Sequence, residues 1–87
     1  MPRRTSDEQM YMNLHPACEA CGVIESQEYH HIVTRATKGP SEDWNALALC
    51  RACHTTWHTE GRKRFTVRYP RVEAKVIAAV KRMGRKW

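Results

Sequence analysis

The sequence lacks any long apolar run: no stretch approaches the roughly 18 consecutive apolar residues that a membrane-spanning helix needs. Its first residues, Met-Pro-Arg-Arg-Thr-Ser-Asp-Glu, also lack the apolar segment of a secretory signal peptide. Internal repeats and low-complexity segments are missing as well. These absences exclude a membrane protein and predict a protein of the reducing, cytoplasmic compartment, with no membrane partner.

The sequence is also short. Its 87 residues allow one domain at most, so we expect residues 1–87 to form a single domain. A domain of this size buries too little apolar surface to be comfortably stable on its core alone. An additional cross-link is therefore expected, by metal or by disulfide. Four residues can supply it: Cys18, Cys21, Cys50 and Cys53.

These four cysteines form two Cys-x-x-Cys pairs, Cys18-Glu-Ala-Cys21 and Cys50-Arg-Ala-Cys53. In a reducing compartment such pairs usually hold metal, because two intervening residues let one tight turn present both sulfurs to one ion. Zinc binds four thiolates in a tetrahedron. The alternative is a pair of disulfides in a secreted protein. A four-thiolate zinc site has no free position for a substrate, so its expected role is in folding and not in catalysis.

Charge is distributed unevenly along the chain. Residues 1–60 carry 5 Lys or Arg against 8 Asp or Glu, and residues 61–87 carry 10 against 1, so their net charges are −3 and +9. A basic tail is typical of proteins that bind a phosphate-rich partner, because each neutralised phosphate releases counterions. A solvated helix face is the alternative. Residues that we expect to contact phosphates are Arg62, Lys63, Arg64, Arg68 and Arg71. No segment resembles a base-reading module, so sequence specificity should be weak.

The pattern of apolar residues predicts three helices and two extended segments. A capping box at residues 5–8 should start a helix that runs to about Met12. Apolar residues recur at helical spacing from Val72 to Met83 and predict the last helix. The other predicted elements are a strand at 27–33, a loop at 34–44, a second extended segment at 45–49, and a helix at 51–60 that ends at Gly61.

Four histidines lie close to the cysteine pairs in the sequence: His30, His31, His54 and His58. His54 and His58 are four residues apart on a predicted helix, so they face the same way and can chelate one ion. His30 and His31 are adjacent on a predicted strand, so their side chains point to opposite faces. One of these two can bind a metal ion with the helix pair, while the other reaches a substrate or a water molecule.

The order of these residues resembles the signature of the HNH nuclease family. The matching positions are His30-His31-Ile32, Asn45, Cys50-Arg-Ala-Cys53-His54 and His58. In that family two strands and a helix form the ββα-metal fold, which is often braced by a zinc on two Cys-x-x-Cys pairs. The resemblance implies a small α+β fold, with an HNH core over residues 18–58 and a basic helical tail over residues 61–87.

The resemblance also implies a role for each matching residue. His30, His54 and His58 look like the ligands of a catalytic divalent ion, which would be Mg²⁺, Mn²⁺ or another. His31 looks like the general base, because a histidine with a pKa near 6.5 is mostly neutral at pH 7 and can take a proton from water. Asn45 looks like the asparagine that braces the adjoining loop through side-chain to backbone hydrogen bonds and keeps the base oriented.

The implied function is a metal-dependent DNA endonuclease that leaves 5′-phosphate and 3′-hydroxyl ends. Its expected partner is double-stranded DNA, with a phage or host DNA-processing protein as a further candidate, inside a bacterium or a phage-infected cell. Two alternatives stay open: a non-catalytic zinc-stabilised module that binds DNA or protein, and a related nuclease that acts on RNA or branched DNA. The loop at 38–44 departs from the Gly-Gly-Asp-like sequence of many members, which puts specificity in doubt.

Overall fold

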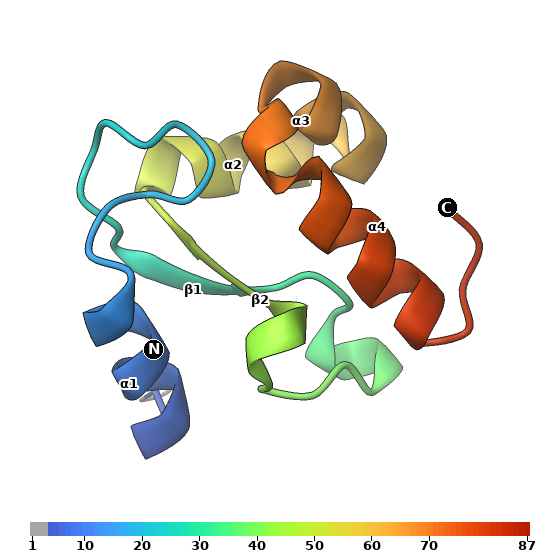
Figure 1. Cartoon of the computed structure of the whole chain (residues 1–87), viewed down its shortest axis with the longest axis horizontal. Coiled ribbons are helices and arrows are strands. Elements are labelled where there is room, and N and C mark those ends of the chain that lie inside the picture. The colour runs from blue at the N-terminus through green and yellow to red at the C-terminus, as the bar shows by residue number, and fades with distance from the viewer. Residues whose placement is uncertain (1–3) are drawn as a thin grey trace.

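The computed structural model describes residues 4–87, which form a small α+β fold with four α-helices and one two-stranded antiparallel sheet (Figure 1). This confirms the predicted fold class. The elements in chain order are α1 (Ser6–Leu14), β1 (Glu28–His31), β2 (Ala46–Leu49), α2 (Arg51–Glu60), α3 (Arg62–Arg68) and α4 (Glu73–Arg82). Within the described residues, no helix is both long and apolar enough to cross a membrane.

The sheet is covered on both faces, and all four residues of β2 are fully buried. On one face Ala46 and Ala48 pack with Tyr11 and Met12 of α1. On the other face, Leu47 and Leu49 join the larger core, to which α2, α3 and α4 contribute. Side chains alternate along a strand. The strand register therefore sends His30, opposite Leu47, toward α2, and His31, opposite Ala46, toward α1.

Helix α1 begins with the predicted capping box. Thr5 Oγ1 accepts a hydrogen bond from the Glu8 backbone N–H at 3.1 Å, and the Glu8 carboxylate accepts one from the Thr5 N–H at 3.0 Å. The helix continues to Leu14, two residues beyond the predicted end, and the backbone leaves the helical conformation at His15, the residue before Pro16.

Both strands are shorter than predicted, and Asn45 accounts for the end of β1 and the start of β2. Its side chain accepts a hydrogen bond from the Val33 N–H at 2.8 Å and donates one to the Val33 carbonyl at 3.0 Å. A side chain therefore satisfies the backbone of Val33 where a paired strand would otherwise do so, and β1 ends at His31. Asn45 itself lies in a short 3₁₀ turn, Asp43–Asn45, and a second such turn, Arg35–Thr37, lies in the predicted loop.

The basic tail contains one helix more than predicted. Gly61, at φ 84°, ends α2 as expected, but the chain then turns directly into α3, whose buried residues are Phe65 and Thr66. Two buried positions among seven residues are too few to produce a helical apolar pattern. The last helix has the predicted buried face, yet α4 starts at Glu73 because Pro70–Val72 form a 3₁₀ turn.

Candidate metal centre and active site

Three histidine side chains converge between β1 and α2. His30 points from the strand toward the helix, and His54 and His58 lie one turn apart on α2. One ring nitrogen from each lies within 4.8 Å of the others, and the Nε2 atoms of His54 and His58 are 3.1 Å apart. The structure thus brings together the three residues that the sequence marks as candidate ligands, in an arrangement that can hold one ion.

His30 supplies the test of whether this cluster fits a metal ion. Its side chain is almost fully buried, and its Nε2 is a buried polar atom without a hydrogen-bond partner among the described residues. Burial, followed by the nearby His54 and His58, lowers the pKa of His30 to about 3, so the ring is neutral and carries a free lone pair. An unpaired buried nitrogen costs free energy, which coordination to a cation would offset. The donor set therefore fits a divalent ion.

Glu28 holds the second candidate ligand, His54, in place. One oxygen of its carboxylate lies 2.8 Å from His54 Nδ1, which leaves His54 Nε2 directed at the cluster. Metal-binding histidines commonly donate their other ring N–H to a carboxylate in this way. Our interpretation of the sequence missed Glu28. Glu28 precedes His30 by two residues on β1, and alternate side chains of a strand lie on the same face. This spacing is the signal in the sequence that could have identified Glu28.

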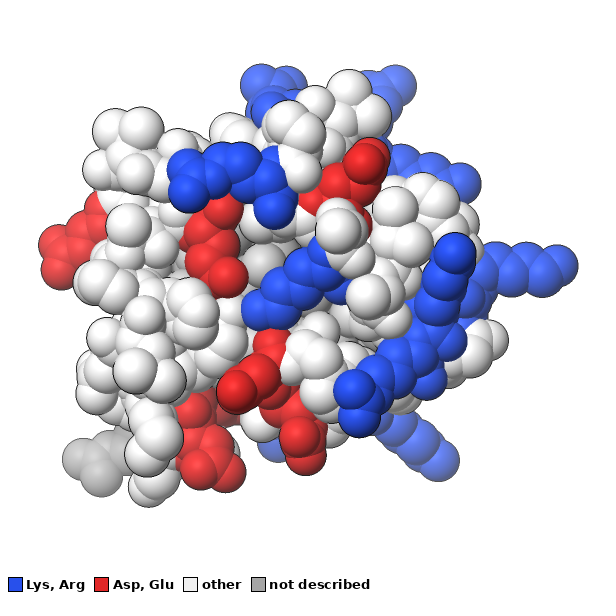
Figure 2. Space-filling model, in the orientation of Figure 1, with Lys and Arg blue, Asp and Glu red and all other residues white. Residues whose placement is uncertain are grey.

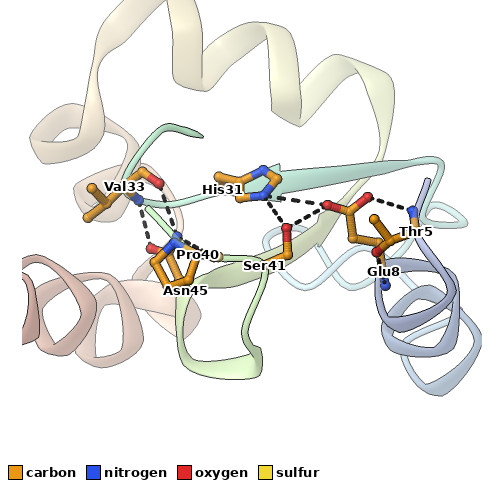
Figure 3. A network of polar contacts seen from close by, with 7 residues as sticks. All are labelled: Thr5, Glu8, His31, Val33, Pro40, Ser41 and Asn45. Carbon is orange, nitrogen blue, oxygen red and sulfur yellow. Dashed lines mark hydrogen bonds and ion pairs between the residues drawn. The ribbon is translucent and has the colours of Figure 1, made fainter. Parts of the chain in front are cut away.

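His31 points to the opposite face of the sheet, as predicted. Its Nε2 lies 2.9 Å from Ser41 Oγ and 3.6 Å from a carboxylate oxygen of Glu8 (Figure 3). Burial lowers the pKa of His31, the charge of Glu8 opposes this shift and Arg35 adds to it, so the net pKa lies below its usual value. The ring is therefore neutral at pH 7. The contacts with Ser41 and Glu8 could not be predicted from the sequence pattern.

Asn45 ties the end of β1 to the loop that follows. It is fully buried and donates a third hydrogen bond to the Pro40 carbonyl at 2.9 Å, in addition to its two bonds with Val33 (Figure 3). The loop passes so close to the strand that a Cβ at Gly39 would lie 1.7 Å from the Val33 carbonyl oxygen. Glycine is therefore required at this position. Asn45 and Gly39 together set the path of the chain from His31 to Ser41.

The four cysteines form a second cluster, compatible with a zinc site. Their sulfurs lie within 4.8 Å of one another, and no disulfide joins them. Hydrogen bonds from the backbone N–H groups of Ile24 and Val23 lower the pKa of Cys21 to about 6, which favours the thiolate that zinc requires. Burial raises the pKa of the other pair, Cys50 and Cys53, so these two thiols need a cation to ionise readily.

Comparison with protein-family models gives a match to the HNH endonuclease family over residues 18–60. This segment belongs to the HNH endonuclease family. The match spans both cysteine pairs, the histidine cluster and Asn45. Neither the search of curated proteins nor the search of solved structures produces a match. Membership of the HNH family indicates a nuclease in general and a metal-binding protein, and HNH domains typically act on DNA.

The HNH segment is followed by the basic surface. Figure 2 shows Lys and Arg side chains gathered over the side of the molecule that carries α3, α4 and the C-terminal residues. All five residues predicted to contact phosphates are exposed, but three contact other parts of the protein. Arg68 forms an ion pair with Glu60 at 2.8 Å, and Arg62 donates to the Lys86 carbonyl at 3.0 Å.

Arg71 is the third basic residue that contacts another part of the protein, although its side chain makes no hydrogen bond or ion pair within residues 4–87. Its guanidinium lies against the first cysteine turn, so closely that a Cβ at Gly22 would lie 1.7 Å from Arg71 Nη1. The side chains of Lys63 and Arg64 make no hydrogen bond or ion pair with any residue of the described range 4–87. Their charges are therefore unpaired within this range and open to a phosphate.

Proposed function

We propose that this chain is a metal-dependent DNA endonuclease, which hydrolyses phosphodiester bonds to leave 5′-phosphate and 3′-hydroxyl ends with low sequence specificity. The convergence of His30, His54 and His58 carries the proposal. A purely structural or DNA-binding zinc module is already stabilised by its four cysteines and has no need of a second donor cluster. The histidine cluster also differs in access: His30 is buried, whereas His58 is exposed, so a phosphate can approach from the side of His58.

Each cluster would hold a different ion. The four cysteines would hold a structural Zn²⁺, and the three histidines would hold Mg²⁺, Mn²⁺ or another divalent ion. That second ion would supply positive charge to stabilise the scissile phosphate and the leaving 3′ oxygen. Glu28 keeps His54 in the tautomer and orientation that direct Nε2 to this site.

The remaining chemistry falls to His31 and Asn45. His31 is neutral at pH 7 and accepts the proton of the water that attacks the phosphorus. Asn45 does not touch the substrate; its three hydrogen bonds hold the end of the strand that carries His31 and the loop beside it. General bases of this kind contribute on the order of 10²- to 10⁴-fold to the rate.

The DNA would lie against the basic surface next to the histidine cluster, because α3 begins two residues after α2 ends. Lys63 and Arg64 are the first candidates for phosphate contacts, since their charges have no partner within the described residues. The other three basic residues of the prediction, Arg62, Arg68 and Arg71, would have to leave a present contact. Contacts to phosphates position a protein on DNA without reading its sequence, which supports low specificity.

The test is the nicking of supercoiled plasmid by the purified protein with Mg²⁺ or Mn²⁺, with EDTA as the metal-free control. We expect His31→Ala to abolish nicking while the fold is retained. The matched control is His15→Ala, because His15 stacks on Tyr11 at 4.1 Å and belongs to neither cluster. Equal nicking by wild type and His31→Ala would contradict the assignment of the base.

The alternatives are outcomes of the same assay. DNA binding without cleavage in any divalent ion would instead support the binding module. A panel of RNA, branched, single-stranded and duplex DNA substrates then decides between a DNA endonuclease and a related nuclease.

A further inference from the structure

A chain of hydrogen bonds runs from His31 to the first helix (Figure 3). His31 Nε2 lies 2.9 Å from Ser41 Oγ, and Ser41 Oγ lies 2.7 Å from Oε2 of Glu8. Glu8 is contributed by α1, far from the strand and loop in the sequence, and it precedes the segment that matches the HNH family. The three side chains meet on the face of the sheet that α1 covers.

Each hydrogen bond in this chain has only one possible direction. An ionised carboxylate only accepts hydrogen bonds, so the Ser41 hydroxyl donates its proton to Glu8. That hydroxyl has no second proton, so toward His31 it must accept, and His31 Nε2 must carry the hydrogen. A neutral imidazole with a proton on Nε2 has its lone pair on Nδ1, and this nitrogen makes no hydrogen bond within the described residues.

Glu8 is held firmly enough to impose this direction. It is 6% exposed, and its other oxygen, Oε1, accepts the capping bond from the Thr5 N–H at 3.0 Å. Burial raises the pKa of Glu8, but hydrogen bonds from Ser41 and Thr5 and the charge of Arg35 lower it by more, so the net pKa lies below its usual value. The carboxylate is thus ionised at neutral pH, and the cap fixes which of its oxygens faces Ser41.

We propose that Glu8 and Ser41 are positioning residues that hold His31 in the tautomer with hydrogen on Nε2 and leave Nδ1 as the nitrogen that takes the proton from water. The ring is also packed against Tyr29, with its centroid 5.0 Å away, so it is restricted on a further side. The catalytic consequence rests on the proposed function; the tautomer itself does not. When Nδ1 takes the proton, the ring becomes a cation, and the carboxylate of Glu8 then stabilises that charge through Ser41.

The first test is the nitrogen chemical shifts of the His31 ring, measured by NMR on the ¹⁵N-labelled full chain with zinc bound, at neutral pH. His31→Ala identifies the signals. For the wild type we expect a protonated Nε2 and an unprotonated Nδ1. For Ser41→Ala we expect both nitrogens to move toward the averaged values of two exchanging tautomers. A wild-type ring protonated on Nδ1, or a ring that Ser41→Ala leaves unchanged, would overturn the proposal.

Glu8→Gln gives the sharpest variant, because it should reverse the chain. The Thr5 N–H needs an acceptor, so the glutamine oxygen takes the capping position and its NH₂ group faces Ser41. Ser41 then accepts from the glutamine and donates to His31 Nε2, which moves the ring proton to Nδ1. Glutamine is as suitable as glutamate in a capping box, so α1 is preserved. Thr5→Ala is the matched control: it removes the other capping bond and should leave the tautomer unchanged.

The second test is the nicking rate. We expect Glu8→Gln to lower kcat on the order of 10²-fold with KM nearly unchanged, because the misplaced proton blocks the base without affecting DNA binding. Ser41→Ala should lower kcat less, because part of its His31 rings still carry the proton on Nε2. Thr5→Ala should stay within about twofold of wild type, because it leaves the oriented base intact. Full activity in Glu8→Gln would overturn the proposal. Absence of nicking by the wild type would refute the proposed function alone, since the NMR shifts still decide whether Glu8 and Ser41 set the tautomer.

Discussion

Replacement of Asn45 should destabilise the protein strongly, and more so when the replacement is aspartate than when it is alanine. The Asn45 side chain is fully buried and makes three hydrogen bonds, one from the Val33 N–H and two to the carbonyls of Val33 and Pro40. Alanine leaves these three backbone groups without their partner. Pro40 is half-buried, so water can hydrate its carbonyl, whereas Val33 is buried and its N–H and carbonyl are left unpaired.

The magnitude follows from these two groups. Each buried polar group without a partner costs about 1–3 kcal/mol, so the loss of two partners in Asn45→Ala should lower the free energy of unfolding by about 2–6 kcal/mol. A protein of this length has a total stability on the order of 4–13 kcal/mol. The alanine variant should therefore lose a large fraction of its stability, and the loop that carries Ser41 should lose its connection to the strand.

Aspartate has nearly the same shape as asparagine but cannot donate. One of its oxygens can still accept from the Val33 N–H, while the other would face two carbonyl oxygens, with a buried negative charge and no donor. Asn45→Asp should therefore unfold more easily than Asn45→Ala at pH 7, although it is the more conservative change in size.

The assay is urea denaturation of the zinc-bound protein at pH 7, with the free energy of unfolding extrapolated to zero denaturant. Asn13→Ala is the matched control, because Asn13 lies exposed on α1 and, among residues 4–87, its side chain bonds only to Gln9. Its loss should cost under about 0.5 kcal/mol. The reasoning is refuted if Asn45→Asp is as stable as Asn45→Ala, or if both variants lose less than about 1 kcal/mol.

Three further predictions concern the metals and the basic surface. Glu28→Gln should weaken the binding of Mn²⁺ to the histidine cluster about 10- to 100-fold in calorimetry, because His54 loses the carboxylate that orients it. An unchanged affinity would show that Glu28 does not support this site. Cys50→Ser should contain no bound zinc in elemental analysis and should lose its helical circular dichroism signal, because zinc binding supplies folding free energy. A variant that is folded without zinc would contradict a structural role for the metal. Replacing Lys63 and Arg64 together by alanine should reduce the slope of log affinity for duplex DNA against log salt concentration by about 1.8, since each phosphate contact contributes about 0.9. An unchanged slope would show that neither side chain contacts a phosphate.

Short-range spacing in the sequence was sufficient for the features that depend on one element. The two Cys-x-x-Cys turns, the capping box of α1 and the buried face of α4 each involve residues within a few positions of one another. Helix geometry alone also places His54 and His58 on one side of α2. Backbone geometry sets the relative positions of such residues, so the pattern predicts them without knowledge of the rest of the fold.

Features that join separate elements were decided by tertiary structure. The sequence carries no sign that Glu8 of α1 would meet Ser41 of a loop and His31 of a strand, or that Arg62 and Arg68 would find polar partners inside the protein. These contacts depend on how α1 docks on the sheet and on how α3 packs after Gly61. Docking is determined by the shape and burial of whole surfaces, which no local spacing records, so only the folded structure shows which side chains meet.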